Sequence, residues 1–318
     1  MIYFVCPDPQ LSISGGNLFN LQILEGLKLL GETVVSFPFQ TFRTLKPKSR
    51  DIILLDSIYM NEIQTFSINQ QPGFKMMLIH LLPSMLNNKS NQQAEKAVLE
   101  NFDLILANSR CTRDYLMDMQ VPGEKIKMMQ PWTMVQELNN DIKRHKLIVV
   151  ANWFPAKQVD LLLQQLSLHS LPDGLTIHFY GDTQVDIKYW KHCLSILEGN
   201  PGLAKHILLE GVVKQAELRK IYTETLCLVD VSLFESYGMA VTEAIVSGTP
   251  VLTLGNGQVK YWIGQGSCMD CKNIDDLIDK LVLIYLDKLD IPRYPITEII
   301  TEESVFRQQL VEVLKTPV

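Results

Sequence analysis

The sequence lacks the features of membrane-spanning, secreted and disordered proteins. Its longest apolar runs, such as Leu226–Val229, are far shorter than the roughly 20 residues that a transmembrane helix needs. Charged residues make up 20% of its 318 residues and hydrophobic residues 47%, which excludes an intrinsically disordered chain. The apolar start Met1–Cys6 has no basic leader, so we expect a buried strand there rather than a signal peptide.

Cysteines and positive charges are also few. The six cysteines stand at no framework spacing, which predicts reduced thiols and a cytoplasmic protein. Cys268 and Cys271 have no second pair or histidine nearby, so packing is favoured over zinc. The net charge of −6 argues against nucleic acid as a partner. A basic cluster from Arg43 to Arg50, beside Phe39 and Phe42, leaves a peripheral membrane contact open, although a solvated loop is favoured.

Short β-branched runs alternate with helical patterns along the whole chain, which predicts the α/β class with two doubly wound, Rossmann-like domains facing across a cleft. We place an N-terminal domain at 1–142, a hinge within 130–146, a C-terminal domain at 143–301, and a final helix at 302–318 that packs on the first domain. The predicted strands are 2–6, 33–37, 51–55, 75–79, 104–107, 126–129, 147–151, 175–180, 206–209, 226–232 and 250–254. The predicted helices are 17–30, 109–119 (capped by Ser109), 158–168, 185–197, 215–223, 239–247, 274–286 and 302–314.

Ligands of such sheets bind beyond the carboxyl ends of the strands, so the loops there are informative. The loop Ser12–Asn17 contains Gly15 and Gly16 and leads into the first predicted helix. Backbone amides of paired glycines at a helix N-terminus suit a phosphate. A tight turn that requires positive φ explains the two glycines equally well, and both interpretations stay open.

A second loop and helix, Phe234–Val251, carry a sharper signal. Glu235 lies in the loop and Glu243 in the helix, and eight helical residues span about 12 Å. The two carboxylates are therefore suited to bind hydroxyl groups at separate parts of one elongated ligand, with the amides at Gly238 and Met239 facing an anionic bridge. The alternative, a helix-start acid and a solvated surface acid, leaves the apolar neighbours of Glu243 unexplained.

The segment Leu226–Thr253 resembles glycosyltransferase family 4, retaining nucleotide-sugar transferases of the GT-B fold, because Glu235 and Glu243 have the spacing of its E-x7-E motif. Residues 152–160 resemble the family's phosphate-clamp segment and residues 211–222 its base-pocket segment. The resemblance implies a transferase that uses no metal and no tightly bound cofactor. It implies a nucleotide-diphosphate sugar as donor, and as acceptor an unidentified glycan, lipid or small molecule.

The same resemblance assigns roles to single residues. Glu243 would bind the ribose hydroxyls, Glu235 the hydroxyls of the transferred sugar, and Lys157 the diphosphate. Together with His80, which matches a histidine after a strand, Glu235 and Lys157 are the predicted catalytic residues. The predicted donor-binding residues are Glu243 and Gly15, Gly16, Asn152, Gly181, Val212, Gly238, Met239 and Ala240.

Two departures from the family pattern concern the phosphate clamp. Asn152 stands where the family has an arginine, and Gln158 stands where a glycine follows the lysine. Arg110 and Arg113 are candidate replacements for the missing cation, although a solvated helix start is the favoured interpretation. Two alternative functions therefore stay open: a non-catalytic sugar-nucleotide-binding protein and a sugar-nucleotide epimerase.

Overall fold

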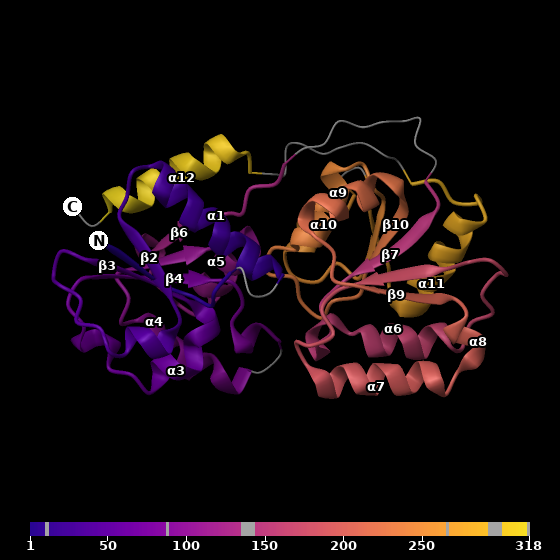
Figure 1. The fold of residues 1–318 in the computed structure, drawn as a ribbon, viewed down its shortest axis with the longest axis horizontal. Helices are drawn as coiled ribbons and strands as arrows, with labels where there is room; N and C mark the ends of the chain where they lie inside the picture. The colour runs from indigo at the N-terminus through magenta and orange to yellow at the C-terminus, as the bar shows by residue number, and fades with distance from the viewer. Residues whose placement is uncertain (10–12, 87–88, 135–143, 265–266, 292–300, 317–318) are drawn as a thin grey trace. The chain divides into compact units, whose positions relative to one another are not determined.

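The computed structural model describes residues 1–9, 13–86, 89–134, 144–264, 267–291 and 301–316. The chain divides into two compact units, one of Met1–Trp132 with Thr301–Val318 and one of Thr133–Ile300 (Figure 1). The predicted hinge at 130–146 falls largely on 135–143, which lie outside the described residues. Each unit is built around its own sheet and is described separately.

The first unit is built on a sheet of six parallel strands in the order β2-β1-β3-β4-β5-β6. The order reverses between β1 and β3, because β2 lies on one side of β1 and the later strands on the other. All six strands were predicted from the sequence, and each end lies within one residue of its prediction. They are β1 (Ile2–Val5), β2 (Val34–Phe37), β3 (Ile52–Asp56), β4 (Phe74–Ile79), β5 (Leu104–Ala107) and β6 (Ile126–Met128).

Helices cover both faces of this sheet. Figure 1 shows α1 (Gly15–Leu29) and α12 (Glu303–Lys315) on one side and α3 (Met60–Gln64) and α4 (Gln92–Leu99) on the other. The helix α5 (Arg110–Asp118) follows β5 and begins as predicted, since the Ser109 hydroxyl accepts a hydrogen bond from the Thr112 amide at 3.0 Å. The sequence missed α2 (Phe39–Phe42), α3 and α4, whose four to eight residues are too few to show a helical period.

The C-terminal helix belongs to the core of the first unit. Phe306 and Leu310 of α12 are buried in one cluster with Phe19 and Ile23 of α1 and with residues of the central strands. Gly26 of α1 allows the close approach, because a Cβ atom there would lie 2.4 Å from Leu310 Cδ1. The last described helix of the chain therefore stabilises the first unit.

The second unit also has six parallel strands, in the order β12-β11-β10-β7-β8-β9. Numbered from β7, this is the Rossmann order, with its reversal between β7 and β10. Five strands were predicted to within two residues at each end, whereas the three-residue β12 was missed. The strands are β7 (Lys146–Val150), β8 (Ile177–Tyr180), β9 (Ile207–Gly211), β10 (Thr225–Asp230), β11 (Val251–Thr253) and β12 (Cys268–Asp270).

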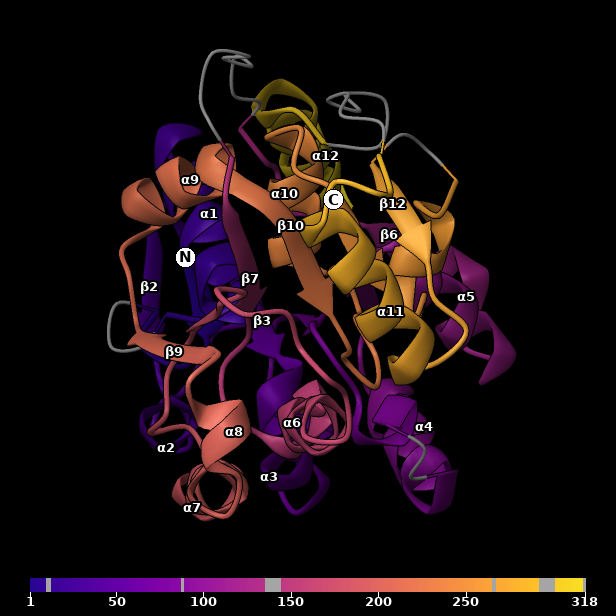
Figure 2. The ribbon, with the colours of Figure 1, turned by 90° about the vertical axis from the view of Figure 1, so that its right-hand side faces the viewer.

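Two hydrophobic clusters lie on opposite faces of this sheet. Alternate residues of β7 point to different clusters: Leu147 and Val149 to one, Ile148 to the other. The first cluster packs against the helices α6 (Val159–Leu166), α7 (Ile187–Glu198), α8 (Pro201–Ala204) and α11 (Ile274–Tyr285). The second packs against α9 (Gln215–Glu224) and α10 (Met239–Val246), and Figure 2 shows the two groups of helices on the two sides of the sheet.

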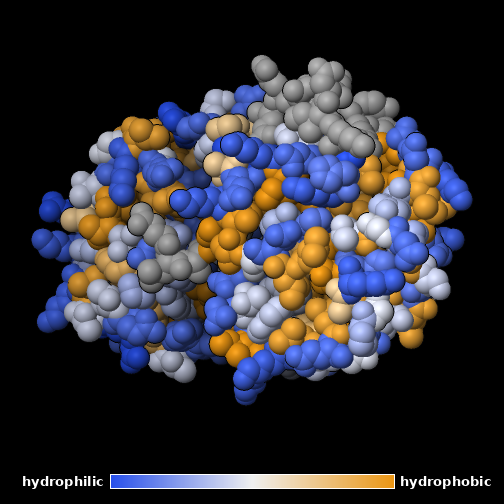
Figure 3. All heavy atoms as spheres, turned by 45° about the vertical axis from the view of Figure 1, so that its right-hand side comes forward, coloured by the Kyte–Doolittle hydropathy of each residue, from blue (hydrophilic) through white to orange (hydrophobic). Residues whose placement is uncertain are grey.

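The structure tests what the sequence suggested about the cysteines and about the basic cluster from Arg43 to Arg50. All six cysteines are buried, free thiols, as predicted. Phe39 and Phe42, beside the basic cluster, are only 2% and 1% exposed, so these two rings are not available to enter a membrane. A peripheral membrane contact through the basic residues stays a prediction. Among the described residues, no helix is both long and apolar enough to span a bilayer. On the face drawn in Figure 3, hydrophilic residues are interspersed with smaller hydrophobic patches.

Phe306→Ala tests whether α12 is part of the first unit's core. Phe306 is 1% exposed, so its truncation is expected to cost about 3 to 5 kcal/mol of that unit's free energy of unfolding. Its neighbour Val305 is 45% exposed, and Val305→Ala is expected to change this free energy by less than about 0.5 kcal/mol. Denaturant unfolding measures both variants. Equal effects of the two substitutions would contradict the packing described.

Candidate functional site

The reversal of strand order in the second unit brings two loops together. The loop after β7 carries Lys157 and the loop after β10 carries Glu235, 78 residues later in the chain. The Leu233 amide donates a hydrogen bond to the Ala156 carbonyl at 2.8 Å, which holds one loop against the other. Lys157 Nζ forms an ion pair and hydrogen bond with Glu235 Oε1. The structure therefore joins two of the residues that the sequence predicted as catalytic.

The ion pair is partly open to solvent, with 21% of the Lys157 side chain and 15% of the Glu235 side chain exposed. Burial lowers the pKa of Lys157, but the negative charges of Glu235 and Asp230 and the hydrogen bond to Glu235 outweigh it, so the pKa is raised overall. Lys157 is therefore a stable cation. Because both partners keep some exposure, either side chain is accessible to a ligand at this edge of the sheet.

Asp230, the last residue of β10, is a third charged group here and was missed by the sequence analysis. Ser232 Oγ lies 2.7 Å from Asp230 Oδ1 and 2.8 Å from Glu235 Oε1. Thr253 Oγ1 donates to Asp230 Oδ2 at 3.0 Å. Burial and the nearby Glu235 carboxylate raise the pKa of Asp230 to about 6, although Lys157 and Ser232 oppose the rise. A carboxyl group within the predicted apolar strand 226–232 was the signal that could have identified it.

The backbone of Glu235 is fixed by a glycine from the loop after β11. Glu235 and Gly257 form an isolated parallel bridge, and the Gln258 amide donates to the Glu235 carbonyl at 2.7 Å. Gly257 has φ of +68°, and a Cβ atom there would lie 2.2 Å from the Glu235 carbonyl oxygen. Only glycine fits at this position, so the direction in which Glu235 leaves the backbone is set by the fold.

The backbone conformation at Gln158 gives a reason for the glycine that the family pattern has after the lysine. Its φ of +50° and ψ of 31° lie in the left-handed region, between the turn that holds Lys157 and the start of α6. This conformation costs a non-glycine residue free energy, which is the physical reason to prefer glycine there. Gln158 adopts this left-handed conformation itself, directly after the turn that holds Lys157.

Glu243 of α10 is 8% exposed, so its interpretation as a solvated surface acid is wrong. Its Oε1 accepts a hydrogen bond from Gln215 Nε2 of α9. Burial raises the pKa of Glu243 to about 7, and Gln215, Arg219 and Tyr222 offset only part of that rise. Glu235 is likewise not a simple helix-start acid, because it is paired with Lys157.

The N-terminus of α10 lies between the two glutamates. Gly238 takes a left-handed conformation, with φ of +80°, and no side chain caps the helix. Amide groups in the first turn of a helix have no partner within the helix, so Met239 and Ala240 present N–H donors that suit an anion. The helix thus offers hydrogen-bond donors between two carboxyl groups, as the sequence predicted.

The remaining predicted residues of the second unit lie on neighbouring strand ends. Asn152 Oδ1 accepts a hydrogen bond from the Asp182 amide at 2.9 Å, so its side chain holds the loop after β8. Gly181 packs so tightly that a Cβ atom would lie 1.9 Å from the Ala151 carbonyl oxygen. Val212, just after β9, is 50% exposed. The family pattern has a positively charged arginine at this position. The Asn152 side chain carries no charge and instead holds the loop after β8.

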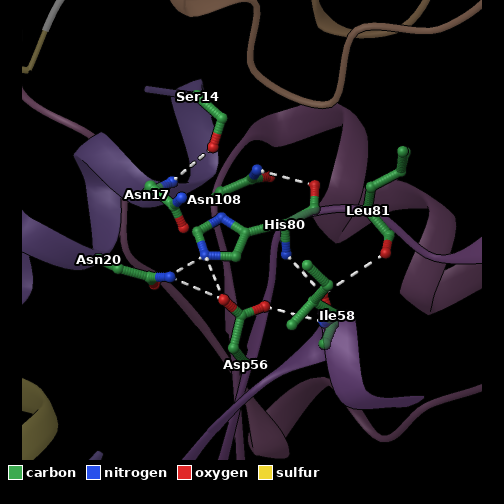
Figure 4. Close-up of polar contacts among 9 residues, drawn as sticks. Ser14, Asn17, Asn20, Asp56, Ile58, His80, Leu81 and Asn108 are labelled. Atoms are coloured by element: carbon green, nitrogen blue, oxygen red, sulfur yellow. Dashed lines mark hydrogen bonds and ion pairs between the residues drawn. The ribbon is translucent and has the colours of Figure 1, made fainter. Parts of the chain in front are cut away.

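In the first unit, α1 begins at Gly15, two residues earlier than predicted. The Ser14 hydroxyl caps the helix by accepting from the Asn17 amide at 3.1 Å (Figure 4). Gly15 and Gly16 are therefore helical residues, and the tight-turn interpretation with positive φ is wrong. A Cβ atom on Gly16 would lie 3.7 Å from the His80 ring. The structure thus brings the predicted glycines and the predicted histidine together.

His80 is held by two buried polar residues that sequence reasoning missed. Its Nε2 lies 2.9 Å from Asn20 Oδ1 and 3.3 Å from Asp56 Oδ2, while Asn20 Nδ2 donates to Asp56 Oδ2 at 2.7 Å (Figure 4). Both neighbours of Nε2 are acceptors, so the neutral ring carries its proton on Nε2. Nδ1, which lies 3.8 Å from a Cβ atom built on Gly16, is then the acceptor nitrogen.

Asp56 gives this arrangement its charge. Burial raises the pKa of Asp56, but the charge and hydrogen bond of His80 and the hydrogen bonds from Ile58 and Asn20 outweigh that effect, so its pKa is lowered. The sequence signal was an acid directly after the predicted strand 51–55, beside the reversal of strand order.

The candidate arginines follow β5 in the first unit. Arg110 is exposed and begins α5, and the Arg113 guanidinium donates to its neighbour Asp114 at 2.8 Å and 3.1 Å. The role of either arginine as a replacement for the missing clamp cation stays a prediction.

Comparisons with known proteins address the fold and the family. The model of a family described as glycosyl transferases group 1 matches residues 131–298, which include Lys157, Glu235 and Glu243. No curated protein matches the sequence. The solved structures that resemble the chain share the GT-B fold of two Rossmann-like domains, which confirms the predicted fold class.

Three of these structures illustrate the likeness. Anabaena HepE in complex with UDP and glucose has a TM-score of 0.75 and 15% identity, over 99% of this chain and 99% of that chain. Sucrose-phosphate synthase from Thermosynechococcus elongatus has a TM-score of 0.72 and 13% identity, over 99% and 96%. The lipopolysaccharide outer core galactosyltransferase WaaB has a TM-score of 0.65 and 13% identity, over 100% and 99%.

Glu243→Gln tests the burial of the second glutamate through the pH dependence of stability. The pKa of Glu243 is higher in the folded protein, about 7, than in the unfolded chain, so its protonated form stabilises the fold and this contribution is lost as pH rises from about 4.5 through 7. The variant is expected to match the wild type at pH 4 and to exceed it by about 3 kcal/mol at pH 8. Denaturant unfolding at both pH values measures this difference.

The control for that experiment is Glu198→Gln, at an exposed position of α7. It is expected to leave the pH profile of the wild type unchanged. A Glu243→Gln profile parallel to that of the wild type would contradict the assigned burial.

Proposed function

Because the chain belongs to the family of group 1 glycosyl transferases, we propose that it transfers a sugar from a nucleotide-diphosphate donor to an acceptor, with retention of anomeric configuration and without a metal ion. The observation that carries this proposal is the arrangement of Lys157, Glu235 and Glu243 around the start of α10. The assignment of the chain to glycosyltransferase family 4 is more specific than the family match, and it stays a prediction.

The donor would lie along the carboxyl edge of the second sheet. The buried Glu243 would accept hydrogen bonds from the ribose hydroxyls, and Glu235 from hydroxyls of the transferred sugar. Between them, Lys157 and the first amides of α10 would bind the diphosphate. The presence of UDP and glucose in the HepE complex supports UDP-glucose as the first donor to test.

The chemistry of the step requires no protein nucleophile. The bond from the sugar's anomeric carbon to the leaving phosphate oxygen breaks, and the acceptor oxygen bonds to the same face of that carbon. The acceptor's proton passes to the leaving phosphate oxygen. Negative charge grows on the diphosphate during this step, so the cation of Lys157 stabilises the transition state more than the ground state.

The first unit would contribute His80 and the amides of Gly15 and Gly16. Asp56 holds the His80 ring by Nε2, so Nδ1 is the nitrogen that would contact the substrate. A neutral ring accepts a substrate hydroxyl at Nδ1, and a protonated ring donates to a phosphate oxygen. The N-terminal amides of α1 suit an anion as well.

The acceptor is proposed only by class, as a glycan, a lipid or a small molecule. We propose the cytoplasm as the place of the reaction, which is supported by six buried, free thiols. Nucleic acid is not proposed as a partner, since the chain's net charge is −6.

A panel of nucleotide sugars tests the proposal through release of nucleoside diphosphate. Replacing Lys157 by methionine removes the charge at similar length, and is expected to lower the rate of transfer about 10² to 10³-fold, because a preorganised cation is lost. The control is Lys205→Met, which should leave the rate unchanged. Lys205 follows α8, and its side chain is 60% exposed.

The same panel separates the alternatives. A binding protein would bind a nucleotide sugar without turnover for any acceptor, and an epimerase would convert one donor into another with no acceptor present. Either result, or full activity in Lys157→Met, would contradict the proposal.

The stereochemical and metal assignments have their own measurement. Proton NMR of the first product formed is expected to show the anomeric configuration of the donor sugar. The rate in excess EDTA is expected to equal the rate with added Mg²⁺, since Lys157 neutralises the diphosphate. An inverted product, or a rate that EDTA abolishes and Mg²⁺ restores, would contradict these assignments.

A further inference from the structure

The Ser232 hydroxyl lies within hydrogen-bond distance of two carboxyl groups but has only one hydrogen to donate. Its oxygen lies 2.7 Å from a carboxyl oxygen of Asp230 and 2.8 Å from one of Glu235. A hydroxyl has a single hydrogen, so it can donate to only one of the two. If both carboxyls were ionised, the other contact would join two oxygens with no hydrogen between them. Both contacts are hydrogen bonds only when one carboxyl is protonated and donates to Ser232.

The surroundings decide which carboxyl holds this proton. Glu235 Oε1 forms an ion pair with Lys157 Nζ, so a proton placed on Glu235 would weaken this pair. Asp230 Oδ2 is bound by the neutral hydroxyl of Thr253, and the thiol of Cys268 on β12 also faces Asp230. Among the described residues, the charged and titratable groups around Asp230 include the Lys157 cation, the Glu235 carboxyl and the Cys268 thiol. Asp270 lies in register with Asp230 two strands away. These surroundings favour Asp230 as the group that takes the proton.

We propose that Asp230 takes up a proton when the donor's diphosphate binds at Lys157, so that donor binding is coupled to pH through the chain Asp230–Ser232–Glu235. This inference rests on the proposed function, since it places the diphosphate at Lys157. Asp230 acts through Ser232 and Lys157 and touches no substrate, so it is a positioning residue.

Charge balance gives the reason for the uptake. Before binding, the single cation of Lys157 faces Glu235 and Asp230. The diphosphate adds two negative charges and draws on the same cation, so an ionised Asp230 would repel it at short range. Protonation of Asp230 removes that repulsion and completes the two hydrogen bonds of Ser232, and it leaves the Glu235 carboxyl to bind the sugar hydroxyls.

The size of the effect follows from the fraction of protein already protonated. Since the pKa of free Asp230 is about 6, only about one molecule in ten carries the proton at pH 7. Binding then recruits this minor form, and the observed Kd rises in proportion. The Asp230 contribution should therefore weaken donor binding about tenfold at pH 7 relative to pH 5.

Asp230→Asn provides the test, because its amide is neutral, donates to Ser232 and accepts from Thr253 as the protonated acid does. UDP-glucose, GDP-mannose and ADP-glucose are titrated in turn by calorimetry, in buffers of different ionisation enthalpy. In these donors both phosphates are diesters, with no proton to lose between pH 5 and 8. Glu243 and His80 are present in both proteins. Any protons that they take up or release on binding therefore cancel in the difference between wild type and variant.

For the nucleotide sugar that binds, the wild type is expected to take up about 0.9 proton more than Asp230→Asn at pH 7. The variant should bind about tenfold more tightly than the wild type at pH 7 and equally well at pH 5. The control Asp270→Asn removes a carboxylate from the end of β12, at the same edge of the sheet, and should keep the wild-type proton count.

A second variant, Ser232→Ala, keeps the inference testable if Asp230→Asn does not fold. The Ser232 hydroxyl is one of the groups that lower the pKa of Asp230, so Ser232→Ala should raise the protonated fraction of Asp230 before the donor arrives and reduce proton uptake at pH 7. Equal proton counts in wild type, Asp230→Asn and Ser232→Ala, with nucleotide still bound, would overturn this inference and leave the proposed function standing. Failure of the wild type to bind any of the three donors would overturn both.

Discussion

The site of the second unit depends on one cation held between carboxyl groups. Lys157 has to stay charged in a partly buried position, and the negative charges of Glu235 and Asp230 make that possible. The same carboxyl groups would oppose an anionic ligand if all of them stayed ionised. This conflict explains why a serine hydroxyl and a titratable acid stand beside the ion pair rather than a second fixed charge.

The fold supplies the precision that this arrangement needs. Parallel strands end at a common edge, and the reversal of strand order brings together the loops after β7 and β10, which carry Lys157 and Glu235. The Leu233 amide holds the loop after β10 against the loop after β7, and Gly257 holds it against the loop after β11. In the first unit, the reversal between β1 and β3 places the start of α1 beside Asp56 and His80 in the same way.

The sequence predicted eleven of the twelve strands described, because they carry short apolar runs between turn signals, and the longer helices carry a clear apolar period. It missed β12 and the helices α2, α3, α4 and α8, which are too short for a period to show. Of the site, it identified Glu235 and Glu243 through a spaced motif, and Lys157 through the resemblance of residues 152–160 to the family's phosphate-clamp segment. It missed Asp230, Asp56 and Asn20, whose importance comes from contacts between residues distant in the chain, such as Asn20 with Asp56. Gln158 shows the converse: its departure from the motif was visible, but its left-handed backbone was not.

The central claim is that one anionic ligand is bound by Lys157 and by the start of α10, between two carboxyl groups. The most direct measurement is a crystal structure of the protein with a bound nucleotide sugar. The account predicts a phosphate oxygen within hydrogen-bond distance of Lys157 Nζ and the ribose hydroxyls on the Glu243 carboxyl group. A nucleotide bound with its diphosphate away from Lys157, or its ribose away from Glu243, would contradict the account.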